Sequence, residues 1–171
     1  MPIELVPRNF DQACLPLVSA FDCGQDKFGK LATDWIRCVD PLNCAIQAIR
    51  DRQTQVFLYN NLAGELVGFG SLGKTTRKLK KVEEEWSIVP HFGIAIQLRG
   101  LPAGAMWQDR YAASIMGDLM SLARDHQTPT LMLKVHQENT PAMKLYGRLG
   151  FKQFCGPNQD GYLTLTIQNH A

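Results

Sequence analysis

Residues 133–151, LKVHQENTPAMKLYGRLGF, carry the clearest structural pattern in this sequence. Apolar and polar residues alternate over the first four positions, which is typical of a half-buried strand. From position 142 the apolar residues follow the i, i+3, i+4, i+7 spacing that places side chains on one face of a helix. That face consists of Ala142, Leu145, Tyr146 and Leu149. The pattern predicts a strand, a turn, a short helix and, from Phe151, a further strand.

The two ends of this predicted helix carry signals of their own. Pro141 suits the first helical position, and it keeps Thr140 out of the helical region, so we expect Thr140 to be the N-cap. Gly150 is expected to take the left-handed conformation that ends the helix.

Five residues in the same stretch, Asn139, Ala142, Tyr146, Gly150 and Phe151, stand at the spacing N-x-x-A-x-x-x-Y-x-x-x-G-F. With this motif the chain resembles the GCN5-related N-acetyltransferases, the GNAT family. The resemblance implies acetyl-CoA as cosubstrate, with the segment of Asn139 and Ala142 beside its pantetheine arm. It also implies that Tyr146 protonates the leaving thiolate. Judged without the resemblance, Tyr146 is a core aromatic on an apolar helix face.

The flanking segments extend the resemblance to about residues 55–167. We predict strands over residues 3–6, 55–59, 65–72, 86–97, 130–136, 151–155 and 162–167, and helices over residues 11–20, 27–37, 42–52 and 110–126. This order indicates an α/β sandwich around a mixed sheet. The resemblance implies the GNAT fold, a single domain over residues 1–171. Its central sheet would be mixed and mostly antiparallel, with splayed central strands and helices on both faces.

Composition argues against several other classes of protein. The hydrophobic fraction is 45% and the charged fraction 20%, as in an ordinary globular protein. No apolar run reaches the ~20 residues that span a bilayer, and the first ten residues lack a signal-peptide pattern, so we expect a cytoplasmic protein. The five cysteines form no CxxC pair, which favours reduced thiols over disulfides or a zinc site.

The start of the helix at residues 110–126 is the expected pyrophosphate site, because unpaired N–H groups at a helix start hold anions. The family uses a Q/R-x-x-G-x-G/A loop here. The resemblance therefore implies cofactor binding by Gln108, Arg110, Tyr111, Ala112, Ala113 and Ser114. Tyr111 stands where the family has a glycine. A residue with a Cβ does not easily take positive φ, so we expect looser phosphate binding or another loop path.

The strand predicted over residues 86–97 is interrupted by Pro90 and Gly93, which suggests an edge, a bulge or the close approach of another group. In the family, the pantetheine amides pair with exposed backbone of this strand. The resemblance implies that this backbone belongs to Phe92, Gly93, Ile94, Ala95 and Ile96.

The implied reaction is direct attack of a primary amine on the acetyl thioester. The amine must be deprotonated, and His91 is the nearest base candidate on the central strand. His136 lies across the expected cleft, and the glutamates at residues 83–85 lie near the loop that precedes the strand. A hydrated site without a dedicated base is a further alternative. For both histidines a surface or hydrogen-bonded role is the simpler interpretation.

Three functions stay open from the sequence. The first is N-acetylation of a small molecule or protein. The second is acetylation of aminoacyl-tRNA by a toxin of a toxin–antitoxin module. FDCG at residues 21–24 resembles such toxins, and the basic run KTTRKLKK at residues 74–81, expected as a hairpin loop, would suit RNA. The third is a GNAT-fold protein that binds acyl-CoA or a partner without catalysis. No membrane partner is expected, and a homodimer is left open.

Overall fold

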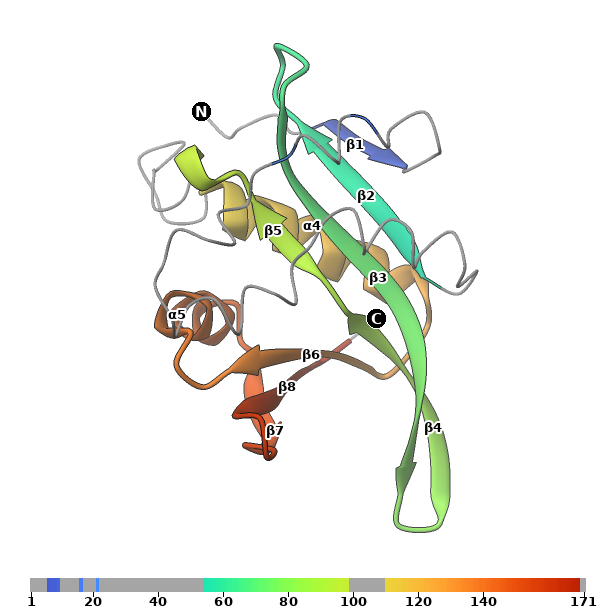
Figure 1. The fold of residues 1–171 in the computed structure, drawn as a ribbon. Coiled ribbons are helices and arrows are strands. Elements are labelled where there is room, and N and C mark those ends of the chain that lie inside the picture. The colour runs from blue at the N-terminus through green and yellow to red at the C-terminus, as the bar shows by residue number, and fades with distance from the viewer. Residues whose placement is uncertain (1–5, 10–15, 17–20, 22–53, 99–109, 170–171) are drawn as a thin grey trace.

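The computed structural model of this chain describes residues 6–9, 16, 21, 54–98 and 110–169 (Figure 1). There, eight strands form one mixed sheet in the order β1-β2-β3-β4-β6-β8-β7, with β5 paired to β3. The strands are β1 (Val6–Asn9), β2 (Gln55–Asn60), β3 (Leu66–Leu79), β4 (Val82–Val89), β5 (Phe92–Ile94), β6 (Thr130–His136), β7 (Lys152–Cys155) and β8 (Tyr162–Gln168). The helices are α4 (Tyr111–Asp125), α5 (Thr140–Arg148) and the short 3-10 helix η2 (Ile96–Leu98).

The second half of the predicted architecture is confirmed. The strand at residues 130–136, the helices that start near residues 110 and 140, and the final hairpin all form as expected. Only β4 and β6 pair in parallel, and the other pairs among the described strands are antiparallel. The first described strand is Val6–Asn9, and residues 3–5 of the strand predicted over residues 3–6 lie outside the described residues. The helices predicted within residues 11–52 lie outside the described residues, apart from Pro16.

The strand predicted over residues 86–97 forms in two parts, so the interruption expected at Pro90 is confirmed, whereas the predicted end of the strand is wrong. The chain forms β4, is interrupted at Pro90 and His91, resumes as β5 and then turns into η2. Proline has no N–H to give to a neighbouring strand, and the His91 N–H is donated to the Ser71 side-chain oxygen at 2.9 Å. The pairing with β3 shifts by one residue across this interruption, which is a β-bulge.

The basic run at residues 74–81 was also predicted wrongly, because most of it is strand. β3 continues to Leu79 and β4 begins at Val82, so the turn consists of residues 80 and 81 alone. Opposite charges face each other across the two strands, with Arg77 opposite Glu84 and Lys78 opposite Glu83. Such cross-strand pairs stabilise an exposed hairpin. The resulting two-stranded ribbon (residues 74–85) extends away from the rest of the sheet (Figure 1).

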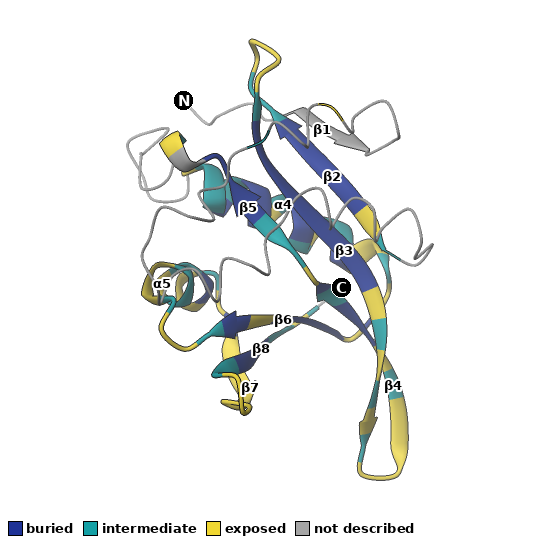
Figure 2. Cartoon of the chain, in the orientation of Figure 1, coloured by how far each residue is buried: buried dark blue, intermediate teal, exposed yellow. Residues whose placement is uncertain are grey.

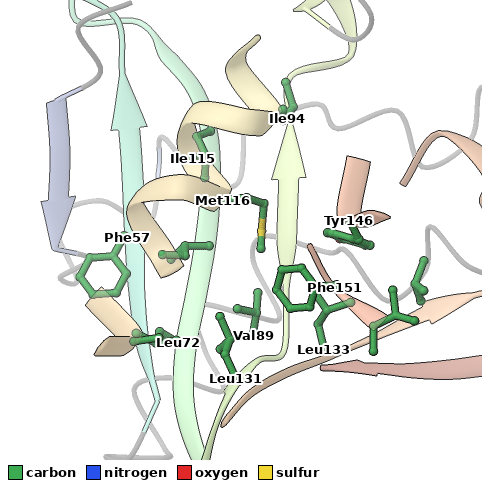
Figure 3. Close-up of a cluster of buried hydrophobic side chains, with 14 of the residues drawn as sticks. Phe57, Leu72, Val89, Ile94, Ile115, Met116, Leu131, Leu133, Tyr146 and Phe151 are labelled. Atoms are coloured by element: carbon green, nitrogen blue, oxygen red, sulfur yellow. The ribbon is translucent and has the colours of Figure 1, made fainter. Parts of the chain in front are cut away.

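The core lies between the sheet and the two α-helices. Its buried cluster joins α4 residues such as Ile115 and Met116 to Leu131 and Leu133 of β6 and to Tyr146 of α5 (Figures 2 and 3). Two glycines of β3 let α4 approach closely. A Cβ on Gly68 or Gly70 would lie 2.5 Å from a side-chain atom of α4. The sequence G-F-G at residues 68–70 therefore sets the distance between helix and sheet.

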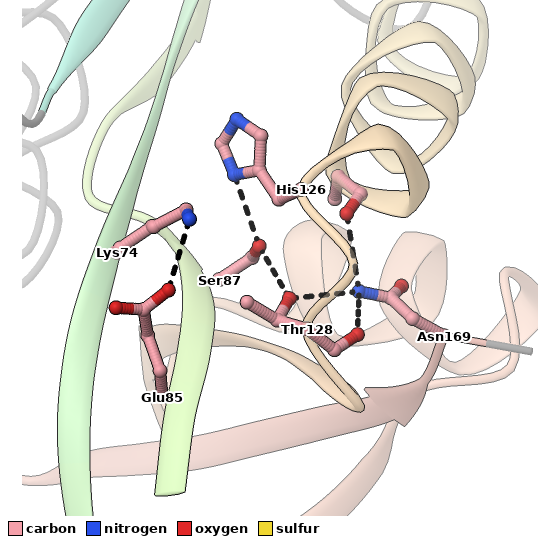
Figure 4. A network of polar contacts seen from close by, with 7 residues as sticks. Lys74, Glu85, Ser87, His126, Thr128 and Asn169 are labelled. Atoms are coloured by element: carbon pink, nitrogen blue, oxygen red, sulfur yellow. Dashed lines mark hydrogen bonds and ion pairs between the residues drawn. The ribbon is translucent and has the colours of Figure 1, made fainter.

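A network of polar contacts stabilises the connection between α4 and β6 (Figure 4). The Ser87 hydroxyl lies 2.7 Å from the Thr128 hydroxyl and 3.2 Å from Nδ1 of His126. The Asn169 side-chain amide donates to the Thr128 carbonyl at 3.2 Å. The network links β4, the C-terminal end of α4 and the end of β8.

Candidate active site

The sheet divides where β4 passes into β5. β4 pairs with β6 at three positions, from Ser87 opposite Leu131 to Val89 opposite Leu133. Beyond these positions β5 stays with β3, whereas β6 stays with β8. The two halves of the sheet therefore separate, as expected for splayed central strands. Among the described strands, none pairs with the second edge of β5.

Two backbone positions of β5 face this opening. The Ser71 N–H donates to the His91 carbonyl at 2.9 Å, and the Ala95 N–H donates to the Val67 carbonyl at 3.0 Å. Because successive residues of a strand direct their N–H and C=O groups to opposite edges, residues 91, 93 and 95 are directed toward β3. The N–H and C=O groups of Phe92 and Ile94 consequently point into the opening. Of the five backbone positions expected here, these two are available to a ligand amide. Ile96 already belongs to η2.

The start of α4 offers a second group of backbone donors. Arg110 is the N-cap, and its side chain makes no capping hydrogen bond. The first N–H to close the helix is that of Ser114, which donates to the Arg110 carbonyl at 2.9 Å. The preceding N–H groups, of Tyr111, Ala112 and Ala113, have no partner within the helix, and the helix dipole makes this end attractive to anions. Gln108 lies outside the described residues.

Tyr111 does not adopt the positive φ that the glycine of the family motif would allow. It is the first residue of α4, and the non-glycine residues with positive φ in the described part of the chain are Lys80 and Gln127. Its half-buried side chain packs against the core cluster. The departure from the family motif at Tyr111 thus leaves the helix start intact.

The start of α5 differs from the prediction by one residue. The N-cap is Asn139, whose side-chain oxygen accepts the Ala142 N–H at 3.2 Å, and Thr140 is the first helical residue. Asparagine is a stronger N-cap than threonine, and proline is tolerated at the second helical position because the N–H groups of the first turn have no partner within the helix. The helix ends as predicted, with Gly150 at φ 95°.

Tyr146 lies on the buried face of α5, with 7% of its surface exposed. Its ring packs edge-on against Phe151 at 5.8 Å, and its side chain extends from α5 toward β5 (Figure 3). Burial raises the pKa of the Tyr146 hydroxyl above its usual range, so the phenol is a neutral proton donor at physiological pH. Ile94 of β5 and Tyr146 of α5 belong to the same core cluster.

The two histidines considered as bases lie on opposite sides of the opening. Phe92 and Ile94 pack toward the core, so the alternation of a strand directs His91 to the face away from α4 and α5. The same alternation, relative to the core residue Val135, directs His136 to that face. Nδ1 of His136 accepts the Glu138 N–H at 3.2 Å, and its ring packs edge-on against Tyr162 at 5.2 Å. The glutamates at residues 83–85 lie on the ribbon, on the far side of the bulge.

Sequence reasoning missed two features of the site. It did not distinguish the residues of the central strand whose backbone is open, because that depends on the pairing with β3. It also missed Gly68, where a Cβ would lie 2.9 Å from the Gly93 carbonyl and would displace β5. The G-F-G sequence at residues 68–70 was the signal available for this second feature.

The comparisons with known proteins agree with this geometry. The model of the acetyltransferase (GNAT) family matches residues 25–151. The chain therefore belongs to the GNAT acetyltransferases, a family whose cosubstrate is acetyl-CoA. No curated protein matches the sequence.

Solved structures share the fold at low sequence identity. A tyrosine-to-phenylalanine mutant of the AtaT toxin, bound to the C-terminus of the antitoxin AtaR and acetyl-CoA, matches with a TM-score of 0.64 and 14% identity, over 96% of this chain and 93% of that one. The ribosomal-protein-S18-alanine N-acetyltransferase from Escherichia coli matches with a TM-score of 0.60 and 12% identity, over 98% and 96%. A GNAT-family protein from Desulfovibrio desulfuricans gives 0.69 and 10%, over 98% and 100%.

Two further observations concern the described residues only. They contain no group of three or more His, Cys, Asp or Glu side chains placed to hold a metal ion. None of their helices is long and apolar enough to cross a membrane. Cys155, the one cysteine among them, is an exposed thiol.

Proposed function

We propose that this protein is an N-acetyltransferase that transfers the acetyl group of acetyl-CoA to a primary amine by direct attack on the thioester. The observation that carries the proposal is the open edge of β5. Its Phe92 and Ile94 backbone groups face an opening between two halves of one sheet, and Tyr146 lies in the core cluster beside it. An extended amide chain such as pantetheine can pair with such an edge as an additional strand would.

The backbone groups take the binding roles in this proposal. The N–H and C=O groups of Phe92 and Ile94 hold the pantetheine amides, and an N–H on this strand polarises the thioester carbonyl. The N–H groups of Tyr111, Ala112 and Ala113 face the pyrophosphate, with the charge of Arg110 beside them. Asn139 acts through the α5 cap, because its side-chain oxygen is already engaged with the Ala142 N–H.

The side chains take the proton-transfer roles. Tyr146 donates its proton to the departing thiolate sulfur and so completes cleavage of the carbon–sulfur bond. His91, on the face away from the helices, accepts the proton of the attacking amine directly or through water. Its place on the bulge puts it next to Phe92, on the side from which an acceptor can approach without crossing α4 or α5.

The proposal is tested by measuring both acetyl-CoA binding and the rate of acetyl transfer. Acetyl-CoA is titrated by calorimetry into the wild-type protein, into Tyr146→Phe and into Tyr162→Phe, which removes a hydroxyl outside the proposed cofactor site. We expect micromolar binding in all three. In steady-state assays with an identified acceptor, Tyr146→Phe should lower kcat by about 100-fold, within the range for loss of a general acid. Absence of binding at millimolar acetyl-CoA would refute the acetyltransferase proposal, and undiminished turnover by Tyr146→Phe would refute the acid assignment alone.

A second candidate function is acetylation of aminoacyl-tRNA by a toxin. The structural likeness to the AtaT toxin over 96% of the chain favours it. Expression in a bacterial host should then arrest growth, and Tyr146→Phe should relieve the arrest. Normal growth at high expression of the wild-type protein would exclude this activity in that host.

The third candidate, binding of acyl-CoA or a partner without catalysis, makes a different prediction. It requires acetyl-CoA binding that Tyr146→Phe leaves intact and no transfer to any amine in an acceptor screen. An amine that is acetylated at a rate dependent on Tyr146 would exclude it.

A further inference from the structure

The excess positive charge of this protein is located on the β3–β4 ribbon. Residues 74–85 contain five basic residues and three glutamates. The whole chain has 18 basic and 16 acidic residues, so the remainder has 13 of each, and the formal net charge of +2 belongs to the ribbon.

Most of the ribbon's charge is compensated near its base. Lys74 forms an ion pair of 2.9 Å with Glu85. Glu84 accepts a hydrogen bond from the Trp86 indole at 3.0 Å, and the Arg77 guanidinium lies 6.0 Å from the centre of that ring. Lys78 faces Glu83 across the ribbon. Lys80 and Lys81, which form the turn, therefore have no acidic residue paired with them across the ribbon.

The turn holds Lys80 in an unfavourable backbone conformation. Lys80 has φ 57°, in the left-handed region that glycine and asparagine adopt readily and that lysine rarely does. Two-residue hairpin turns favour glycine, asparagine and aspartate for this reason. Protection of exposed strand edges explains lysines along a strand, but residues 80 and 81 are the turn itself and have no edge to protect. A lysine at this position is therefore better explained by a ligand than by folding.

We propose that the tip of the ribbon, Lys80 and Lys81 with Lys78 beside them, binds the phosphate backbone of a nucleic acid. Lysine ammonium groups are compact point charges that suit phosphate oxygens. The tip of the ribbon is exposed over residues 80–83 (Figure 2), and a two-stranded ribbon is a shape that nucleic-acid grooves admit. Its strand continues through the bulge into β5, so the tip lies at most about 35 Å from the open backbone, at ~3.3 Å per residue. A helical nucleic acid held at the tip can thus reach the opening with one end.

The experiment measures nucleic-acid binding without acetyl-CoA. A pool of deacylated bacterial tRNA is titrated into the full-length protein at 50 to 200 mM salt, and the slope of log K against log salt concentration is determined. The test variant is Lys80→Asn with Lys81→Gln, because asparagine tolerates positive φ. The matched control is Lys144→Gln with Lys152→Gln, which removes two exposed lysines from α5 and β7. Thermal unfolding verifies that both variants are folded.

We expect the test variant to lose affinity by about 10-fold or more at low salt and its slope to fall by about 2, since each phosphate contact contributes ~0.9 to the slope. The control should retain the wild-type slope. Equal slopes for the wild type and the test variant would overturn the proposal. Competition by poly-L-glutamate as effective as that by tRNA, at equal charge concentration, would also overturn it and indicate an acidic protein partner. Because neither acetyl-CoA nor Tyr146 enters the measurement, failure here leaves the proposed acetyl transfer standing.

Discussion

Among single residues, His126 is expected to make the stability of the folded protein depend on pH. It caps the C-terminal end of α4, and its Nδ1 lies 3.2 Å from the Ser87 hydroxyl. Burial, followed by the positive charge of Lys74, lowers the pKa of the His126 side chain, whereas Asp125 and Glu85 act in the opposite direction. The protonated form is therefore less favourable in the folded protein than in the unfolded chain.

This shift predicts lower stability in acid. The unfolded chain binds the His126 proton near its ordinary pKa of about 6.5, and the folded protein binds it only at lower pH. The free energy of unfolding should thus be constant above neutral pH and decrease as pH falls below about 6.5. Urea unfolding of the wild type and of His126→Asn at pH 7.5 and 5.5 measures this. The variant should show the smaller pH dependence, and His136→Asn serves as the control. An equal loss in the wild type and His126→Asn would contradict the assignment.

The sequence predicted the residues of α5 well and its cap imperfectly. Ala142, Tyr146 and Gly150 lie where helix periodicity placed them. The cap was assigned to Thr140 because proline was given the first helical position, where it is favoured, but the second position also tolerates it. Local sequence rules could not separate these cases. The choice depends on Asn139, whose own N–H is fixed by the His136 carbonyl at 2.9 Å.

At the scale of elements, the glycines of β3 support a matched pair of variants. Gly68→Ala places a Cβ 2.5 Å from Ile115 and 2.9 Å from the backbone carbonyl of Gly93, whereas Gly70→Ala meets only the flexible Leu119 side chain. Both should destabilise the protein by about 1–3 kcal/mol through overpacking. Only Gly68→Ala should also weaken acetyl-CoA binding, because it displaces β5. Thermal unfolding and calorimetry separate the two effects, and equal affinities for both variants would contradict the role of β5.

A substitution in the ribbon turn is expected to stabilise the protein rather than destabilise it. Lys80→Gly relieves the left-handed conformation of a side-chain-bearing residue, so stability should rise by about 1 kcal/mol and the melting temperature by a few degrees. Lys81→Gly is the comparison, since Lys81 has no positive φ. It should lower stability or leave it unchanged. A stabilisation by Lys81→Gly as large as that by Lys80→Gly would show that the gain does not come from backbone conformation.

The ribbon also shows why element boundaries were the weakest part of the sequence prediction. Lysine is depleted in strands, so the lysine-rich residues 74–81 were assigned to a loop. Pairing across the ribbon decides the conformation, and this pairing becomes visible only when the register of β3 and β4 is known. The same holds for β5, because the switch at Pro90 depends on which neighbours each half of the strand finds.

Across the protein as a unit, a ligand in the opening would join the two halves of the sheet. We predict that acetyl-CoA slows hydrogen exchange at the amides of Phe92 and Ile94, which face the opening. The amides of Gly93 and Ala95 face β3 and should be protected with or without the ligand. NMR of the labelled protein resolves the four amides. Equal protection of all four in the absence of acetyl-CoA would contradict the open edge.

The overall architecture was the most predictable property of the chain. The periodicity of residues 110–167, together with the motif that includes Asn139 and Tyr146, indicated the mixed sheet and its family. Two aspects of the site were not predictable from local sequence. The direction of each backbone N–H on β5 and the close approach of α4 at Gly68 both depend on contacts between segments far apart in the chain.

The short parallel contact between β4 and β6 has a mechanical consequence. Three residue pairs, at positions 87–89 and 131–133, are all that joins one half of the sheet to the other through strand pairing in the described part of the chain. The two halves of the sheet are thus connected by a shorter pairing than that of β3 with β4 or of β6 with β8. Under a pulling force between β2 and β8 these three pairs would be the weakest point in the strand pairing of the sheet. A molecule bound across the opening would connect the two halves of the sheet a second time and would raise the force needed to separate them.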